Sequence, residues 1–135
     1  MEQTLIVAGL VLFLLGLLTG IIAPKLTNPR MGVSSHIQGM TNGPFLILVG
    51  VLWPQVNLPH AWGVATVVLL VFGAFANWLA MQLGAVWGAG HRYAPGVAGA
   101  HRASRAKEQT VTWLLIALTP AMIIGTVLLI VGVLR

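Results

Sequence analysis

The stretch that decides the fold is Ser34–Trp53, SSHIQGMTNGPFLILVGVLW, because its first half is polar and its second half is apolar. Only the ten residues from Pro44 onward are continuously apolar, whereas a helix needs ~20 residues to cross a hydrocarbon core of about 30 Å. Pro54 closes the far end, so a helix of spanning length has to include the polar half. Polar groups inside a membrane are costly and mark a functional site by default. We therefore single out His36 and Asn42.

The composition supports a membrane setting for this stretch. The chain has 135 residues, of which 58% are hydrophobic and 7% are charged, whereas a soluble domain carries about 25% charged residues. Four spans are predicted, at about residues 4–23, 34–53, 62–87 and 111–134. Their apolar runs are continuous, unlike the alternating strands of a β-barrel, and the acidic start of the chain is unlike a signal peptide. We expect an all-α integral membrane protein, a four-helix bundle that forms a single domain over residues 1–135.

The charges predict how the chain lies in the membrane. The net charge is +5, and six of the seven basic residues fall in the first and third connections between spans: Lys25, Arg30, Arg92, Arg102, Arg105 and Lys107. This is the positive-inside pattern, so both termini are expected on the non-cytoplasmic side of a cell inner membrane that the chain crosses several times. The basic residues are accounted for by topology and by contact with lipid headgroups, and no nucleic-acid partner is expected. Trp53, Trp62, Trp87 and Trp113 fall at span ends and are expected to be interfacial anchors.

The polar residues at membrane depth predict where a site lies. At ~1.5 Å per residue, Asn42 lies ~12 Å from the cytoplasmic end of its span and Asn77 lies ~15 Å from the same side of the next span. The two asparagines are therefore at nearly the same level on antiparallel helices. They either converge on one cavity or form an ordinary interhelical amide pair, which stabilises a membrane protein by about 0.6 kcal/mol.

His36 shares a helix face with several glycines, including Gly39 and Gly43. Two interpretations remain open at this point. The small residues are typical of a helix-packing seam, as is expected for Gly9, Gly16 and Gly20 of the first span. Alternatively, the face suits a porphyrin, with His36 as the axial ligand of the haem iron and a second coordination position left open. The other histidines, His60, His91 and His101, lie in connections and are expected to be solvated. There is no cysteine, which excludes disulfides and thiolate ligands.

The order of a few residues resembles a known family. The matching positions are His36, Asn42-Gly43, Pro54, Ala76-Asn77 and the segment Leu115–Ala121. This pattern is similar to that of the small membrane isomerases related to styrene oxide isomerase, and within that group the chain looks most like the hydroxylaminobenzene mutases of nitroarene degradation, enzymes of aromatic catabolism. The resemblance covers roughly Val33 to the C-terminus.

The resemblance implies a homotrimer of four-helix protomers, each with haem b held by the histidine of the second span. Carried over by position, His36 would be the axial ligand, and Asn42 and Asn77 would be catalytic pocket residues. In the porphyrin interpretation of the glycine face, Gly39 and Gly43 would lie beneath the macrocycle. The epoxide isomerases have a pocket tyrosine four residues beyond the matching asparagine, where this chain has Met81. This departure puts epoxide chemistry in doubt, because a thioether cannot donate a hydrogen bond to an epoxide oxygen.

The expected activity is the rearrangement of hydroxylaminobenzene to 2-aminophenol with no net redox change. Ferric haem would act as a Lewis acid, since no carboxylic acid lies at membrane depth, and Phe75, Trp78 and Met81 would line the aryl site. One alternative is the isomerisation of an aryl epoxide to an aldehyde. Two others come from different classes: a small multidrug transporter, which normally needs a membrane-embedded carboxylate that this chain lacks, and a haem-anchoring subunit of an electron-transfer complex.

Overall fold

The computed structural model describes residues 1–135 and contains four long helices joined by short connections. The helices are α1 (Glu2–Ile22), α2 (Pro29–Leu52), α3 (His60–Trp87) and α4 (Arg105–Leu134), and short 3-10 turns follow α1 at Ala23–Lys25 (η1) and α2 at Trp53–Gln55 (η2). The all-α prediction is confirmed. There is no strand, and the only segment of substantial length outside the helices is residues 88–104.

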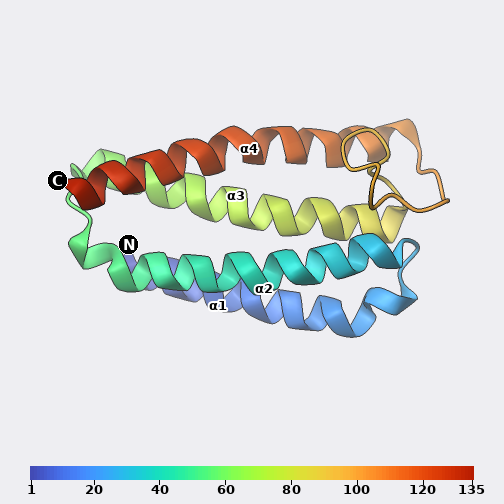
Figure 1. The fold of residues 1–135 in the computed structure, drawn as a ribbon, viewed down its shortest axis with the longest axis horizontal. Helices are drawn as coiled ribbons and strands as arrows, with labels where there is room; N and C mark the ends of the chain where they lie inside the picture. Colours follow the sequence, from blue (N-terminus) through green and yellow to red (C-terminus); the bar gives the residue numbers. More distant parts are fainter.

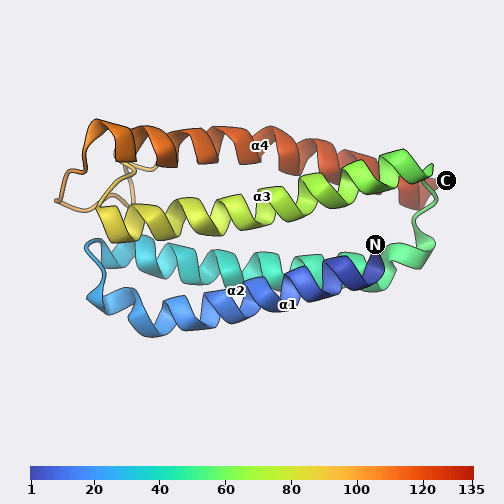
Figure 2. The same cartoon turned by 180° about the vertical axis from the view of Figure 1, so that it is seen from behind.

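The helices lie side by side in chain order from α1 to α4 (Figure 1). The view from behind shows the same order (Figure 2). Helix α1 packs mainly on α2, α2 packs on α3, and α3 packs on α4, with a small direct contact between α1 and α3. Helices α2 and α3 are therefore the inner pair. In this position α2 can turn polar side chains toward a neighbouring helix, as Ser35 and Gln38 do in their hydrogen bonds to α3.

Three of the four helices, α1, α3 and α4, are long and apolar enough to cross a membrane. Helix α2 is long enough, with 24 residues, but the polar residues of its first half lower its hydropathy. The sequence therefore correctly identified α2 as the unusual helix of the set.

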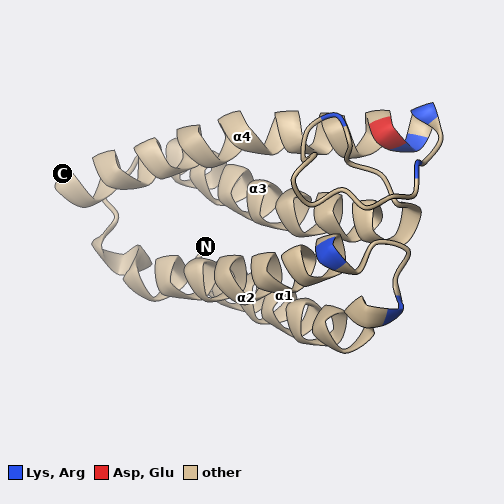
Figure 3. Cartoon of the chain, turned by 45° about the vertical axis from the view of Figure 1, so that its right-hand side comes forward, with Lys and Arg blue, Asp and Glu red and all other residues tan.

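Both chain termini lie at one end of the molecule, and the connections that follow α1 and α3 lie at the other (Figure 1). Figure 3 shows lysines and arginines gathered at the end with these two connections, whereas Arg135 is the C-terminal residue at the opposite end. The charge separation on which the topology prediction depends is thus present in the folded chain. Which end faces the cytoplasm stays a prediction.

All four helices begin before their predicted spans, α4 by six residues, at Arg105, and α2 by five. Helix α2 begins at Pro29, five residues before the predicted span, because proline is favoured in the first turn and Asn28 caps the end. The Asn28 Oδ1 atom accepts from the Met31 amide at 3.4 Å. The Asn28 amide N–H also donates to the Ala85 carbonyl at 2.9 Å, and its Nδ2 donates to Val97 at 2.9 Å. Asn28 is 2% exposed and joins three segments of the chain.

The tryptophans do not all behave as predicted. Trp62 and Trp113 are exposed, at 56% and 66%, as expected for anchors at a membrane surface. Trp53 is only 8% exposed and belongs to the main apolar core with Leu5 and Leu46. The prediction for Trp53 was wrong because η2 turns the chain back over the end of the core, which buries the indole ring.

Candidate active site

Asn42 and Asn77 converge on a third amide side chain, that of Gln38. The Gln38 Oε1 atom accepts a hydrogen bond from Asn77 Nδ2 of α3 at 2.8 Å and from Asn42 Nδ2, one turn along α2, at 3.3 Å. We call Gln38, Asn42 and Asn77 the amide cluster. The expectation that the two asparagines meet at one level is confirmed, but they meet through Gln38, which the sequence argument had not assigned to the site.

The Oδ1 atoms of Asn42 and Asn77 make no hydrogen bond within the chain, and neither is sealed from the surface by burial. All three residues of the amide cluster are partly buried. The amide cluster thus holds two carbonyl acceptors that remain free to bind a ligand. An acceptor without a partner is costly in a dry environment, so this position favours a ligand that donates hydrogen bonds.

His36 lies against α1. Its Nδ1 atom is 2.8 Å from the carbonyl oxygen of Gly16. Since a carbonyl only accepts, the neutral ring carries its proton on Nδ1 and leaves the Nε2 lone pair free. No hydrogen bond involves Nε2, and this atom is not buried. A histidine that donates from one nitrogen to a backbone carbonyl is typical of metal and haem ligands, because that bond fixes the tautomer and the ring orientation.

His36 and the amide cluster lie on different faces of α2. At 100° per residue, His36 and Gln38 are about 160° apart around the helix. The hydrogen bonds agree with this estimate, because His36 contacts α1 whereas Gln38 contacts α3. A single protomer therefore does not bring His36 together with Asn42 and Asn77.

The glycine face of α2 is covered by α1. A Cβ atom on Gly43 would come within 2.8 Å of the Gly9 carbonyl oxygen, and one on Gly39 would run into the backbone of Gly16. The small residues of α2 therefore form a helix-packing seam with α1, as one of the two interpretations expected, and the expected packing role of Gly9 and Gly16 is confirmed. Within the protomer Gly39 and Gly43 offer no open face to a macrocycle, because the backbones of α1 and α2 already fill that space.

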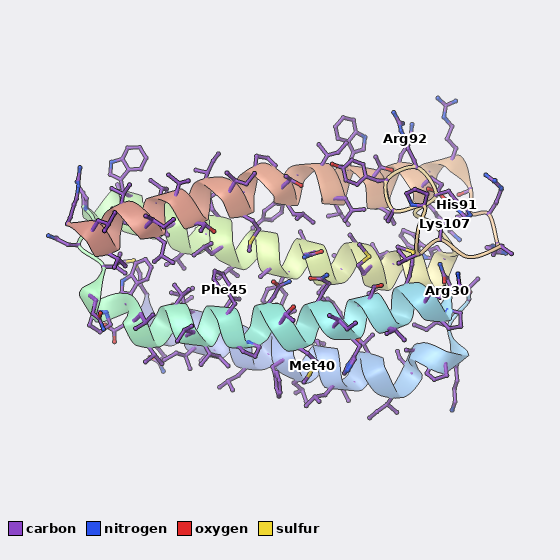
Figure 4. The ribbon with its side chains drawn as sticks, viewed as in Figure 1. Arg30, Met40, Phe45, His91, Arg92 and Lys107 are labelled. Atoms are coloured by element: carbon purple, nitrogen blue, oxygen red, sulfur yellow. The ribbon has the colours of Figure 1, made fainter.

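The three side chains predicted to line an aryl site are divided between two places. Phe75 and Trp78 pack against the main apolar core, whereas Met81 packs against a second cluster around Ala80 and Val111. The Trp78 indole N–H also donates to the Thr19 hydroxyl of α1 at 3.2 Å. Figure 4 shows Phe45 between α2 and α3. This residue packs against the same core as Phe75 and Trp78, and the sequence argument had not assigned it.

The four cavities in the structure lie away from these residues, and none is lined by His36, Asn42 or Asn77. The free atoms of His36 and of the amide cluster are consequently on the surface of the protomer. A pocket that excludes water at this place needs a further surface to close it.

The connection between α3 and α4 is more ordered than expected for a solvated loop. Glu108 accepts from the Gly90 amide at 3.0 Å and from the His91 ring at 3.2 Å, and the other ring nitrogen of His91 lies 2.9 Å from the Gly99 carbonyl. Figure 4 shows His91 at the charged end of the molecule. The expectation of a solvated His91 was wrong, because both of its ring nitrogens face acceptors supplied by this fold. His60 and His101 are exposed, as expected.

The same contacts shift the pKa of Glu108. Burial by itself raises the pKa of this carboxyl, but the hydrogen bonds from Gly90 and His91 and the charge of His91 together lower it below its ordinary value of 4.5. A lowered pKa in the folded state adds stability that is present above the ordinary value and is lost as the pH falls through the folded-state pKa.

We expect the Glu108→Gln variant to loosen residues 88–104. Loss of the charge-assisted bonds, about 1 kcal/mol, should raise amide hydrogen exchange in this segment about fivefold at pH 7. The difference between wild type and variant should shrink as the pH falls from the ordinary carboxyl pKa through the lowered folded-state pKa, below which Glu108 of the wild type is itself protonated. Equal exchange at pH 7 would show that the loop does not depend on Glu108.

Haem is the cofactor that the family resemblance implies, and His36 is the residue that would hold it. The His36 ring fits the group, because its Nδ1 is anchored and its Nε2 lone pair is free. The structure has no group of three or more histidine, cysteine or acidic residues that could hold a bare metal ion. Any iron at this site would therefore need a macrocycle to supply its other ligands.

An inner helix with one available imidazole and a cluster of amides, in a fold built from long apolar helices, defines a class of small all-α membrane-type enzyme. The chain belongs to the styrene oxide isomerase family, whose model matches residues 1–134. It is an isomerase.

Two named enzymes are similar to the chain over most or all of its length. The chain is 55% identical over 135 residues to hydroxylaminobenzene mutase HabA of Ectopseudomonas oleovorans, a match that covers all of both chains. It is 43% identical over 124 residues to hydroxylaminobenzene mutase HabB of the same organism, covering 92% of this chain and 76% of that protein. No solved structure matches the chain. The family recognised from His36, Asn42-Gly43 and Asn77 is thereby confirmed.

Proposed function

We propose that the protein rearranges an N-aryl hydroxylamine, such as hydroxylaminobenzene, to the corresponding 2-aminophenol. The observation that carries the proposal is the identity of 55% over the full chain to a named hydroxylaminobenzene mutase. The amide cluster adds to it, because its free acceptors suit a substrate with N–H and O–H groups. In this reaction the N–O bond breaks and a C–O bond forms at the ortho carbon. The proton lost from that carbon is balanced by the proton gained at nitrogen, so there is no net redox change.

We propose that His36, through Nε2, would hold haem b. When bound, a ferric haem supplies a Lewis acid that weakens a bond to oxygen without a proton donor. The residues of the chain orient the imidazole and the substrate and exclude water. The Gly16 carbonyl holds the imidazole orientation, Asn42 and Asn77 orient the polar end of the substrate, and an apolar wall keeps water from the reactive arene fragment.

We propose that the active enzyme is a homo-oligomer, a trimer by family resemblance. Two observations support an assembly. His36 and the amide cluster are on different faces of α2, and no cavity encloses either of them. A neighbouring protomer that brings its His36 to this amide cluster would complete the site and exclude water from it.

We further propose that the chain is a multi-pass protein of the cell inner membrane with both termini away from the cytoplasm. The gathering of basic residues at one end (Figure 3) supports this orientation. The polar half of α2 would then cross the membrane between α1 and α3.

The substrate is tested by assaying purified protein with phenylhydroxylamine and with styrene oxide in parallel. We expect conversion of the hydroxylamine and little conversion of the epoxide, since Met81 stands where the epoxide isomerases have tyrosine. Preferential conversion of the epoxide would overturn the proposal.

Asn42→Ala and Asn77→Ala should each lower kcat on the hydroxylamine by about tenfold while the haem content is kept. A tenfold loss corresponds to one hydrogen bond of roughly 1.4 kcal/mol. Unchanged rates in both variants would reduce these residues to a packing role.

A further inference from the structure

We infer that Gln38 is a positioning residue that makes the amide cluster selective for substrates with hydrogen-bond donors. The inference rests on the proposed function and deepens it. Its starting point is the pair of bonds, 2.8 Å and 3.3 Å long, by which Asn77 and Asn42 donate to one acceptor, Gln38 Oε1. Asn42 and Asn77 are on different helices, and Gln38 lies one turn from Asn42. The hydrogen bond from Asn77 Nδ2 to Gln38 Oε1 links α3 to α2 at this level.

The two bonds fix which way each asparagine amide faces. In a primary amide the oxygen and the nitrogen point to opposite sides of the terminal carbon. When Nδ2 is turned toward Gln38, Oδ1 is therefore turned away from it. Both Oδ1 atoms lack a partner in the chain and are not buried. Gln38 Oε1 thus takes up one N–H of each asparagine and leaves both Oδ1 atoms facing outward as acceptors, while the second N–H of each amide stays unpaired.

A pair of acceptors suits the chemistry of a hydroxylamine. Its N–H and O–H groups can donate to Oδ1 in the ground state. As the N–O bond breaks, positive charge develops on the arene–nitrogen fragment, so the N–H becomes more acidic and its hydrogen bond becomes stronger. An interaction that strengthens in the transition state raises kcat, whereas one of constant strength only lowers KM.

An epoxide makes the opposite demand. It has no donor, and its oxygen gains negative charge as the ring opens, so it needs hydrogen-bond donors. Facing two carbonyl acceptors, it leaves both without a partner, and a site built to hydrogen-bond a donor rejects an analogue that lacks it. The orientation imposed by Gln38 would therefore act together with Met81 against epoxides.

The test is the ratio of kcat/KM for phenylhydroxylamine to that for styrene oxide in purified, haem-loaded protein. Gln38→Met keeps the length of the side chain but removes the acceptor, so both asparagine amides are free to rotate. We expect the ratio to fall at least about tenfold, with the loss on the hydroxylamine mainly in kcat. Gln38→Glu keeps an acceptor for both Nδ2 atoms and should restore most of the ratio.

Gln82→Met is the matched control. Gln82 is a second glutamine of the inner helices, and its buried Oε1 has no hydrogen-bond partner, so the substitution should leave the ratio unchanged. A ratio unchanged in Gln38→Met, in protein that still converts the hydroxylamine, would overturn the role of Gln38 alone. Wild-type protein that does not convert the hydroxylamine would instead overturn the proposed function. If the kcat/KM ratio fell in Gln38→Glu as far as in Gln38→Met, the result would contradict the assigned orientation, in which Gln38 is the hydrogen-bond acceptor.

Discussion

Replacing His36 with alanine is expected to abolish the Soret band of the purified protein and to lower turnover by more than about 100-fold. Mutation of a residue that only hydrogen-bonds to a metal ligand already lowers activity by up to about 100-fold, so removal of the ligand itself should lower it further. The reason is the arrangement of this ring. Its Nδ1 is held by the Gly16 carbonyl at 2.8 Å, its Nε2 is free, and the structure offers no second imidazole at this level of the helices. Without His36 no imidazole remains at this level to hold the iron.

Two further measurements make this expectation sharper. In His36→Gly, added imidazole should restore both the Soret band and part of the activity, since the small molecule can occupy the space of the missing ring. His60→Ala is the control, because His60 is exposed at the start of α3, and it should behave as wild type. A His36→Ala protein with an unchanged Soret band would contradict the ligand assignment, and a colourless but active wild-type protein would remove the haem from the account.

Substitution of Gly39 by valine is expected to give the largest loss of stability among point variants. A side chain at this position would run into the backbone of Gly16 and lie 3.0 Å from the Leu12 carbonyl oxygen, and backbone cannot move aside as a flexible side chain can. Overpacking of about 2–3 kcal/mol corresponds to a fall in Tm of about 10 °C for a chain of this size. Thermal unfolding in detergent, followed by size-exclusion chromatography, measures the change.

A pair of milder variants tests whether the effect arises at the α1–α2 contact. Gly16→Ala and Gly39→Ala insert atoms at the same place, so their effects on Tm should be less than additive once the first has separated the helices. Gly96→Ala is the control, because a Cβ atom there would meet nothing within 4 Å. Additive effects, or a loss in Gly96→Ala equal to that in Gly39→Val, would show that the seam is not the cause.

Much of the fold could be predicted because hydropathy is a local property of the sequence. The four helices, the polar character of α2 and the common level of Asn42 and Asn77 all follow from span length and helix rise. The residues at which the helices begin could not be predicted from hydropathy. Asn28 starts α2 before the apolar stretch, and its bonds to Ala85 and Val97 depend on segments far away in the sequence.

The parts of the site that the sequence argument missed depend on which helix faces which. A stripe of small residues is the same pattern whether it contacts a helix or a flat ligand, so Gly39 and Gly43 could not be assigned to α1 in advance. Gln38 did carry a usable signal, since it is polar, at membrane depth and four residues before Asn42. The bond between His91 and Glu108 joins residues 17 positions apart through an irregular loop, and no periodicity predicts the path of such a loop.

Purified protein incubated with hydroxylaminobenzene, in the absence of oxygen and of any added reductant, gives a product balance that shows whether the reaction is an isomerisation. We expect 2-aminophenol to accumulate in an amount equal to the hydroxylamine consumed, since an isomerisation needs no electron donor or acceptor. Formation of aniline or nitrosobenzene, or recovery of the hydroxylamine unchanged, would contradict the proposed rearrangement.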